Sequence, residues 1–240
     1  MSHPIGTLYL IPTTLGDNEP LEVLPISVKK IIEQTNTFIV ENEKTARRFI
    51  KKINPSKQQS TLELFPLNKF TDSSLLPGFL EPCLKGSHVG LISEAGCPGV
   101  ADPGAEIVKI AHQKNIKVVP LVGPSSILMA MMSSGMNGQN FAFNGYLPID
   151  KTERKDELKR LERISFDQNQ SQIFIETPYR NNKMLESLCA ILDDDTQICV
   201  ACDITLSTEF IKTKTAHAWK KNSVDLHKRP TIFIIHKYKY

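Results

Sequence analysis

The chain has 240 residues, of which 40% are hydrophobic and 23% are charged, as is typical of a globular protein with one large or two small domains. Its apolar stretches are interrupted by proline or charge before they reach the ~18 residues that a membrane-spanning helix needs. The N-terminus lacks the cationic start and cleavage site of a signal peptide, and the five cysteines have no regular spacing. We therefore expect a cytoplasmic protein with structural thiols.

The positive charge is concentrated near the C-terminus. The net charge is +3, and residues 211–240 contain eight Lys or Arg residues against one acid. Such a segment can contact the phosphates of a nucleic acid. It can equally form a solvated face with lysines that protect strand edges from aggregation. The second interpretation is simpler, because aromatic and basic residues are not regularly interleaved here.

The N-terminal half alternates predicted strands and helices. Residues 7–11 and 37–40 are apolar and rich in β-formers, and the second run leads into a segment with a helical apolar stripe. Residues 54–87 are rich in Pro, Ser and Lys and give the weakest prediction. Within them, 75–84 favours a helix despite its two prolines.

Residues 88–104, HVGLISEAGCPGVADPG, are the most informative stretch. An apolar run breaks into a glycine- and proline-rich loop, and Asp102-Pro103 has the N-cap and first-turn pattern of a helix start. A second apolar run at 117–122 completes a parallel strand–helix–strand unit. Because parallel sheets bind ligands at the carboxyl ends of their strands, we expect 93–101 to contact a small molecule through its backbone.

The C-terminal half repeats this pattern. Thr177-Pro178 has the cap and first-turn pattern of a helix that runs to Leu192. Parallel units in both halves predict an α/β fold with two domains, 1–122 and 123–240, and with the ligand cleft between them. The other predicted elements are strands at 141–147, 172–175, 196–201 and 231–236 and helices at 127–133 and 151–163.

The loop at 93–101 matches neither of the two common phosphate-binding patterns, G-x-x-x-x-G-K-[ST] and G-x-G-x-x-G. Glu94 and Asp102 flank it, which disfavours a triphosphate without a metal and favours a ligand with positive charge and hydroxyl groups. Cys199 and Cys202 have a metal-ligand separation but lie in an apolar strand, and no second pair accompanies them. We therefore predict no metal site.

Six segments follow one another along the chain: LYLIPTTLGD (8–17), ISEAGCPGVADPG (92–104), VPLVGPSS (119–126), FAFNGYLP (141–148), ETPYR (176–180) and ITLSTEF (204–210). In this order they resemble the tetrapyrrole methylase superfamily, and most closely its branch of small-subunit ribosomal RNA 2′-O-ribose methyltransferases. The resemblance implies a homodimeric α/β enzyme of two domains that binds S-adenosylmethionine between them.

The resemblance also implies which residues bind the cofactor. A Gly/Pro loop can hold the methionyl and adenine edges of S-adenosylmethionine with main-chain groups alone. Asp102, Ser125, Ser126 and Thr177 are first of all predicted helix-start residues, and contact with the cofactor is a second role. The predicted cofactor-binding residues are Pro12, Ser93, Glu94, Ala95, Gly96, Val100, Asp102, Ser125, Ser126, Thr177, Pro178 and Tyr179.

Methyl transfer from a sulfonium is an in-line displacement, so alignment of the reactants supplies much of the acceleration. A ribose hydroxyl is a poor nucleophile at neutral pH and gains from a general base. Glu41 and Glu176, at predicted strand ends, are the catalytic candidates. Alternatively, Glu41 is an acid that accepts hydrogen bonds from the backbone amides at a helix start.

The acceptor motif departs from the family pattern. Where ribosomal members read E-D-T-R, this chain reads Glu41-Asn42-Glu43-Lys44. Lys44, Arg47, Arg48 and Arg180 are the predicted substrate-binding residues, with an RNA of the small ribosomal subunit as the partner. Two alternatives remain open: a methylase of a corrin or porphyrin precursor, and a cofactor-binding module without catalysis.

Overall fold

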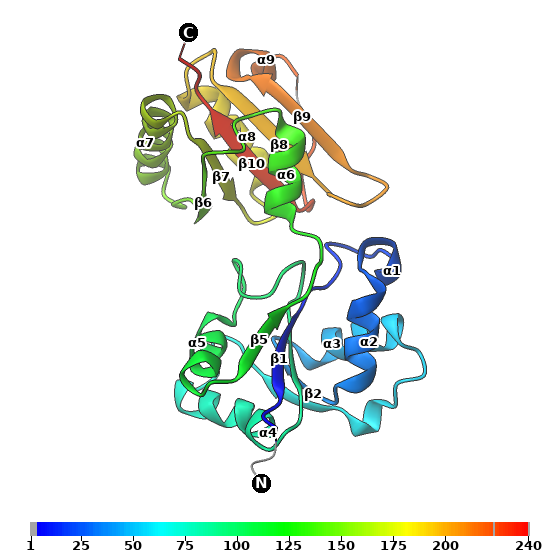
Figure 1. Ribbon diagram of the computed structural model, residues 1–240. Coiled ribbons are helices and arrows are strands. Elements are labelled where there is room, and N and C mark those ends of the chain that lie inside the picture. Colours follow the sequence, from blue (N-terminus) through cyan, green and yellow to red (C-terminus); the bar gives the residue numbers. More distant parts are fainter. Residues whose placement is uncertain (1–3, 223, 240) are drawn as a thin grey trace. The chain divides into compact units, whose positions relative to one another are not determined.

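The computed structural model describes residues 4–222 and 224–239, which form two compact units. Residues up to Ser125 belong to the first unit and residues from Ser126 to the second. Each unit contains its own five-stranded sheet with helices packed on it (Figure 1). The α/β class with two domains, predicted from the sequence, is confirmed.

The sheet of the first unit is entirely parallel, with the strand order β3-β2-β4-β1-β5. The register pairs Ile92 with both Ile11 and Val40, so the carboxyl ends of the three central strands meet at one edge. Strand β3 lies in the stretch with the weakest prediction and was not predicted, and β5 ends two residues before the predicted 122. The strands are β1 (Thr7–Ile11), β2 (Thr37–Val40), β3 (Glu63–Pro66), β4 (Val89–Ile92) and β5 (Lys117–Pro120).

Helices cover both faces of this sheet (Figure 1). On one face Phe38 and Ile92 pack in a buried cluster with residues of α2 and α3. On the other face Leu8 and Leu91 pack with residues of η2, α4 and α5. The helical elements are α1 (Pro20–Val23), α2 (Ile26–Gln34), α3 (Glu43–Ile53), the 3-10 helices η1 (Gln59–Thr61) and η2 (Ser73–Leu80), α4 (Glu81–Leu84) and α5 (Ala105–Gln113).

The sheet of the second unit has the order β6-β7-β10-β8-β9 and is mostly antiparallel. Strands β6 and β7 are parallel, whereas β10 is antiparallel to β7 and β8, and β8 is antiparallel to β9. The prediction of parallel units in both halves therefore holds in this unit only for β6 and β7, which are joined through α7, and is wrong for its other strand pairs. Only residues 203–209 link β8 to β9, too few for a helical crossover. The strands are β6 (Phe141–Tyr146), β7 (Ser171–Ile175), β8 (Gln197–Cys202), β9 (Phe210–Thr215) and β10 (Thr231–His236).

The core of the second unit is centred on Phe174 and Phe233, whose stacked rings lie 5.9 Å apart. Residues of α7, α8 and α9 complete this cluster. Helix α6 is held to the sheet by the Thr213 hydroxyl of β9, which donates to the Ser134 carbonyl at 2.7 Å. These helices are α6 (Ser126–Ser134), α7 (Lys151–Gln168), α8 (Asn181–Ile191) and α9 (Ala216–Lys220).

All five cysteines carry free thiols, and four of them are buried. Cys199 and Cys202 are three residues apart on β8, so alternation places them on opposite faces of the sheet. Burial raises the pKa of both thiols. They are therefore structural thiols, as the sequence predicted. Across the described ranges, the structure has no helix that is both long and apolar enough to traverse a bilayer.

Candidate active site

The loop after β4 is fastened to the loop after β1. The buried Ser93 hydroxyl donates to the Gly96 carbonyl, and the Thr13 amide donates to the same oxygen at 3.0 Å. Gly96 has φ +72°, and a Cβ there would lie 3.0 Å from Leu15 and 3.1 Å from the Pro124 carbonyl oxygen. This position therefore requires glycine, and the two loops form one rigid backbone surface at the carboxyl edge of the sheet.

A third loop, which follows β5, packs against the other two. Pro12 lies so close to Gly123 that a Cβ on this glycine would be 2.2 Å from the proline ring. The Cys97 thiol donates to the Pro124 carbonyl at 3.4 Å. The predicted cofactor residues Pro12, Ser93 and Gly96 are thus brought together by the loops that follow β1 and β4. Ser125 directly follows this third loop, and Ser126 begins α6.

Three carboxylates gather at the same edge. Glu41 directly follows β2. Glu94 lies in the loop after β4, and Asp102 lies farther along that loop. Burial, and then the negative charges of Glu41 and Glu94, raise the pKa of Asp102 to about 6. Among the described residues, no three His, Cys, Asp or Glu side chains are arranged to hold a metal ion. The edge is therefore electronegative and favours an organic cation.

Asp102 does not cap a helix, contrary to the sequence prediction. Helix α5 begins at Ala105, and its N-cap is Gly104 with φ +137°. A Cβ on Gly104 would lie 2.6 Å from the Leu91 side chain, so only glycine allows this entry into the helix. The Asp102 carboxyl is consequently available to the site. Ala95 and Val100 of the same loop are exposed.

Helix α3 carries three of the four residues predicted to bind substrate. Its N-cap is Asn42, whose Oδ1 accepts from the amides of Lys44 at 2.9 Å and Thr45 at 3.3 Å. Asn42 thus has the capping role considered for Glu41. Arg47 is already engaged, because its guanidinium donates to the Gln59 carbonyl at 2.8 Å. Lys44 and Arg48 are exposed.

In the second unit, Glu176 anchors the turn after β7. Its buried carboxylate accepts from the Thr177 amide and from Arg180 Nη2, both at 2.6 Å. The Arg180 amide bonds the Thr177 carbonyl at 2.9 Å, which closes a turn over Pro178. Helix α8 therefore begins at Asn181, and the predicted start at Thr177-Pro178 is wrong. The cap pattern failed because residues 177–180 form a separate turn, and the N-cap of the helix is Arg180.

The model of the family described as Tetrapyrrole (Corrin/Porphyrin) Methylases matches residues 7–218 of this chain. The chain belongs to this family. The match covers both units and every segment that carried the resemblance. The chain is accordingly a methyltransferase of the tetrapyrrole methylase fold.

Individual relatives agree with this assignment. The "Ribosomal RNA small subunit methyltransferase I" of Vibrio cholerae is 25% identical over 235 residues, which are 97% of this chain and 77% of that protein. The protein of the same name from Bacillus subtilis is 32% identical over 209 residues, which are 87% of this chain and 67% of that protein.

Solved structures share the fold. The methyltransferase CobJ matches with a TM-score of 0.64 at 16% identity, over 97% of this chain and 94% of that one. The uroporphyrin-III-C-methyltransferase of Thermus thermophilus matches with a TM-score of 0.57 at 14% identity, over the same shares of the two chains. At these identities the matches bear on the fold alone.

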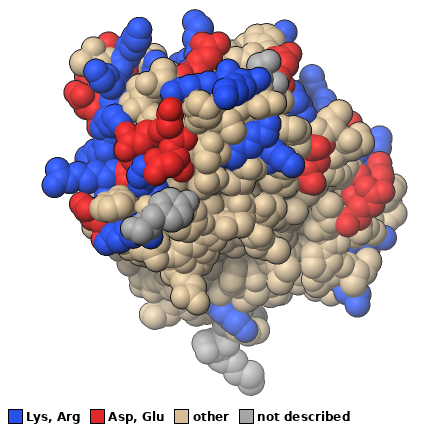
Figure 2. Space-filling view, turned by 90° about the horizontal axis from the view of Figure 1, so that it is seen from above, with Lys and Arg blue, Asp and Glu red and all other residues tan. Residues whose placement is uncertain are grey.

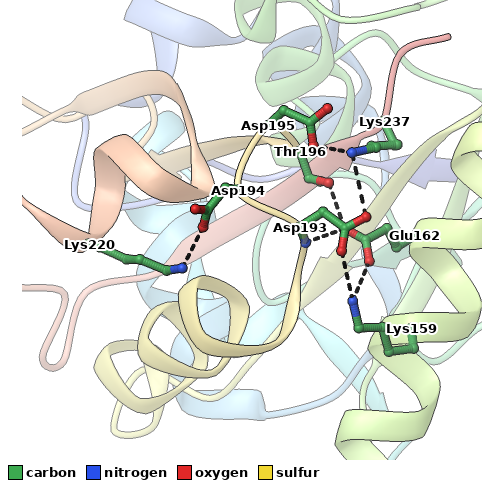
Figure 3. Close-up of polar contacts among 8 residues, drawn as sticks. All are labelled: Lys159, Glu162, Asp193, Asp194, Asp195, Thr196, Lys220 and Lys237. Carbon is green, nitrogen blue, oxygen red and sulfur yellow. Dashed lines mark hydrogen bonds and ion pairs between the residues drawn. The ribbon is translucent and has the colours of Figure 1, made fainter.

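Ion pairs within its own unit neutralise part of the basic C-terminal segment of this tetrapyrrole methylase. Lys237 pairs with Asp193 and Asp195, and Lys220 pairs with Asp194 at 2.5 Å (Figure 3). Figure 2, which views the molecule from above, shows basic and acidic side chains next to each other. This supports the solvated-face interpretation for these lysines. It argues against a continuous cationic track along the segment.

Buried Glu162 organises the acidic turn that receives these lysines (Figure 3). Its carboxylate accepts from the Asp193 amide at 2.8 Å, the Thr196 hydroxyl at 2.6 Å and Lys159 Nζ at 2.9 Å. The role of Glu162 is not evident from the sequence, because an acid inside a charged amphipathic helix is expected to be solvated.

Proposed function

We propose that this methylase transfers a methyl group from S-adenosylmethionine to a ribose 2′-hydroxyl in the RNA of the small ribosomal subunit. Relatives named Ribosomal RNA small subunit methyltransferase I, aligned over 87% and 97% of this chain, support the acceptor. The chemistry of the carboxyl edge of the first sheet supports the donor. We further propose that the enzyme acts as a homodimer in the cytoplasm.

The observation that carries the donor assignment is the pairing of a rigid Gly/Pro loop with three carboxylates. S-adenosylmethionine has a sulfonium and an ammonium group, and Glu41, Glu94 and Asp102 provide the opposite charge. Burial, and then the charges of Glu41 and Glu94, raise the pKa of Asp102, and a bound cation would favour its charged form. The donor set therefore fits the ligand. We assign Pro12, Ser93, Glu94, Ala95, Gly96, Val100 and Asp102 to its binding, together with Ser125, Ser126, Thr177 and Pro178.

When bound, S-adenosylmethionine supplies a methyl group already activated by the positively charged sulfur. The residues of this chain have to orient the acceptor hydroxyl and accept its proton. Of the two predicted bases, Glu41 lies beside the other carboxylates, whereas Glu176 is held by Thr177 and Arg180. We therefore assign the proton-accepting role to Glu41 and a positioning role to Glu176. Lys44 and Arg48 are exposed and suited to contact RNA phosphates.

Two experiments test the proposal. Calorimetric titration with S-adenosylmethionine and S-adenosylhomocysteine should show binding of both at one site per chain. Tritiated S-adenosylmethionine should then label small ribosomal subunits that lack the modification, and should leave corrin and porphyrin precursors unlabelled. Labelling of a tetrapyrrole precursor instead would transfer the assignment to that acceptor. Binding without transfer to any acceptor would indicate a non-catalytic module, and no binding would overturn the donor assignment.

A further inference from the structure

Two turns of the second unit are joined at its surface. Residues 225–229 pack against the turn that Glu176 anchors and against the start of α8. The Lys228 amide donates to the Pro178 carbonyl at 3.0 Å, and Asn181 Nδ2 donates to the Arg229 carbonyl at 2.6 Å. The Leu226 amide donates to Asn182 Oδ1 at 2.7 Å. The backbone of one turn is therefore fixed relative to the other.

Lys228 has an unfavourable backbone conformation. Its φ is +61°, in the left-handed region that residues with a Cβ seldom occupy. The bond from its amide to Pro178 holds it there. Backbone strain that is maintained in this way is concentrated at sites of function. In this conformation, the side chain of Lys228 lies over its neighbour across the two turns.

That neighbour is Tyr179, a residue that is 69% exposed. Lys228 Nζ lies 5.9 Å from the ring centroid. The His227 ring meets it edge-on, with the centroids 5.9 Å apart. We call Tyr179, His227 and Lys228 the basic aromatic cluster. Aromatic and basic residues that are far apart in the sequence are thus interleaved in space, which the sequence pattern did not indicate.

A second exposed aromatic residue lies near the same turn. Tyr146 is 62% exposed and lines a hollow of about 570 Å³ together with Ile149, Thr177 and Arg180. Arg180 is held by the buried Glu176 carboxylate at 2.6 Å, so its guanidinium is fixed beside this hollow. Tyr146 and Tyr179 therefore each have a cation close to them.

We propose that the basic aromatic cluster binds an unpaired nucleotide of the RNA substrate, with its base stacked on Tyr179 and its phosphate near Lys228. The inference rests on the proposed function and names a contact for that substrate. Exposed aromatic rings beside cations are the usual means of binding single-stranded RNA. The resemblance assigned Tyr179 to the cofactor. A cofactor with a net positive charge, however, gains less from the charge of Lys228 than a polyanion does.

The test uses a fluorescent single-stranded RNA 12-mer of mixed sequence and the full chain, with fluorescence anisotropy as the readout. Tyr179→Leu removes the ring, and Tyr179→Phe retains it. Lys228→Asn removes the charge, and asparagine tolerates the left-handed backbone. Phe166→Leu and Lys239→Asn are matched controls, because Lys239 lies 5.5 Å above the Phe166 ring elsewhere in the same unit.

We expect Tyr179→Leu to weaken RNA binding about tenfold, as for the loss of one stacked base, and Tyr179→Phe to have little effect. Lys228→Asn should lower the slope of log affinity against log salt concentration by about 0.7. The control variants should bind as the original chain does. The Kd for S-adenosylmethionine, measured by calorimetry, should stay unchanged in all of them.

Three results would overturn the inference. In the first, Tyr179→Leu and Lys228→Asn bind RNA as the original chain does, and the original chain methylates ribosomal subunits. This result would leave the proposed function intact. Another is a weaker Kd for S-adenosylmethionine in Tyr179→Leu with normal RNA binding, which would return this residue to the cofactor site. The third is competition by polyglutamate equal to that by RNA, which would indicate an acidic protein partner. An original chain that neither binds RNA nor methylates subunits would overturn the proposed function as well.

Discussion

The hydroxyl of Thr45 donates to Glu94 Oε1 at 2.6 Å, across 49 residues of sequence. This bond joins helix α3, which carries the predicted substrate-binding residues, to the loop after β4, which carries the predicted cofactor contacts. The carboxylate of Glu94 is thereby held in one orientation at the carboxyl edge of the first sheet.

Thr45→Val should weaken the binding of S-adenosylmethionine. Loss of one hydrogen bond to a carboxylate costs about 1 kcal/mol, which corresponds to roughly a fivefold higher Kd by calorimetry. Thr45→Ser keeps the hydroxyl and should bind normally. Thr61→Val, which removes a surface bond to the Gln58 carbonyl, should have no effect on the Kd. Equal Kd values for Thr45→Val and the original chain would exclude a role for this bond.

The pKa of Asp102 predicts how binding depends on pH. This carboxyl titrates at about 6, so it is increasingly charged as the pH rises from 5 to 7. We expect the affinity for S-adenosylmethionine to increase over this range, because the carboxylate attracts the cation. In Asp102→Asn the affinity should be lower at pH 7 and nearly independent of pH. Calorimetry at pH 5, 6, 7 and 8 checks both expectations.

The same carboxyl should affect the stability of the ligand-free protein. Between pH 3.8, its ordinary pKa, and about 6, the folded protein retains a proton that the unfolded chain has released. The free energy of unfolding should therefore fall as the pH rises through this window and then level off. In Asp102→Asn, the free energy of unfolding measured by urea titration should lack this decrease. A variant with the same pH dependence as the original chain would contradict the assignment.

Glu41→Gln and Glu176→Gln should differ in what they impair. Glu41→Gln should lower the rate of methyl transfer by about 10²-fold, the lower end of the usual range for loss of a general base, with little change in Tm. Glu176→Gln should lower the free energy of unfolding by about 1–2 kcal/mol, because it weakens a charged hydrogen bond to Arg180. Single-turnover rates and thermal unfolding separate the two. A slow, equally stable Glu176→Gln variant would reverse the two roles.

Gly104 should tolerate no side chain. Gly104→Ala places a Cβ 2.6 Å from Leu91 at φ +137°, and we expect a loss of about 3 kcal/mol in the free energy of unfolding. Gly99→Ala is the matched control, because its φ is +77° but nothing lies within 4 Å of the added Cβ. This control should lose only about 1 kcal/mol. Similar losses in the two variants would mean that contact with Leu91 is unimportant.

The sequence predicted the first unit better than the second. Strands β4 and β5 follow from apolar runs on either side of the 93–104 loop and helix α5. Their common direction follows from the helix between them, and both pair in parallel with β1. The antiparallel pairs of the second sheet were not predicted. For β8 and β9, the direction depends on the short link of residues 203–209. Strand β9 itself has alternating lysines, FIKTKT, that resemble a solvated segment.

The two helix starts that failed share one cause. Asp102-Pro103 and Thr177-Pro178 both have the pattern of a cap followed by a first turn. In the structure, the N-caps are Gly104, which packs against Leu91, and Arg180, which the buried Glu176 carboxylate holds. The pattern of a cap followed by a first turn does not contain these contacts. The pairing of Tyr179 with Lys228 was missed for the same reason, because 48 residues separate the two positions.

The central claim is tested most directly by the position of the transferred methyl group. Small ribosomal subunits that lack the modification are incubated with the enzyme and tritiated S-adenosylmethionine, and their RNA is hydrolysed in alkali. Methylation of a 2′-hydroxyl blocks cleavage at that nucleotide, so the account predicts that the label is recovered in a dinucleotide. Label recovered in mononucleotides would place the methyl group on a base, and unlabelled RNA beside a labelled tetrapyrrole precursor would contradict the account.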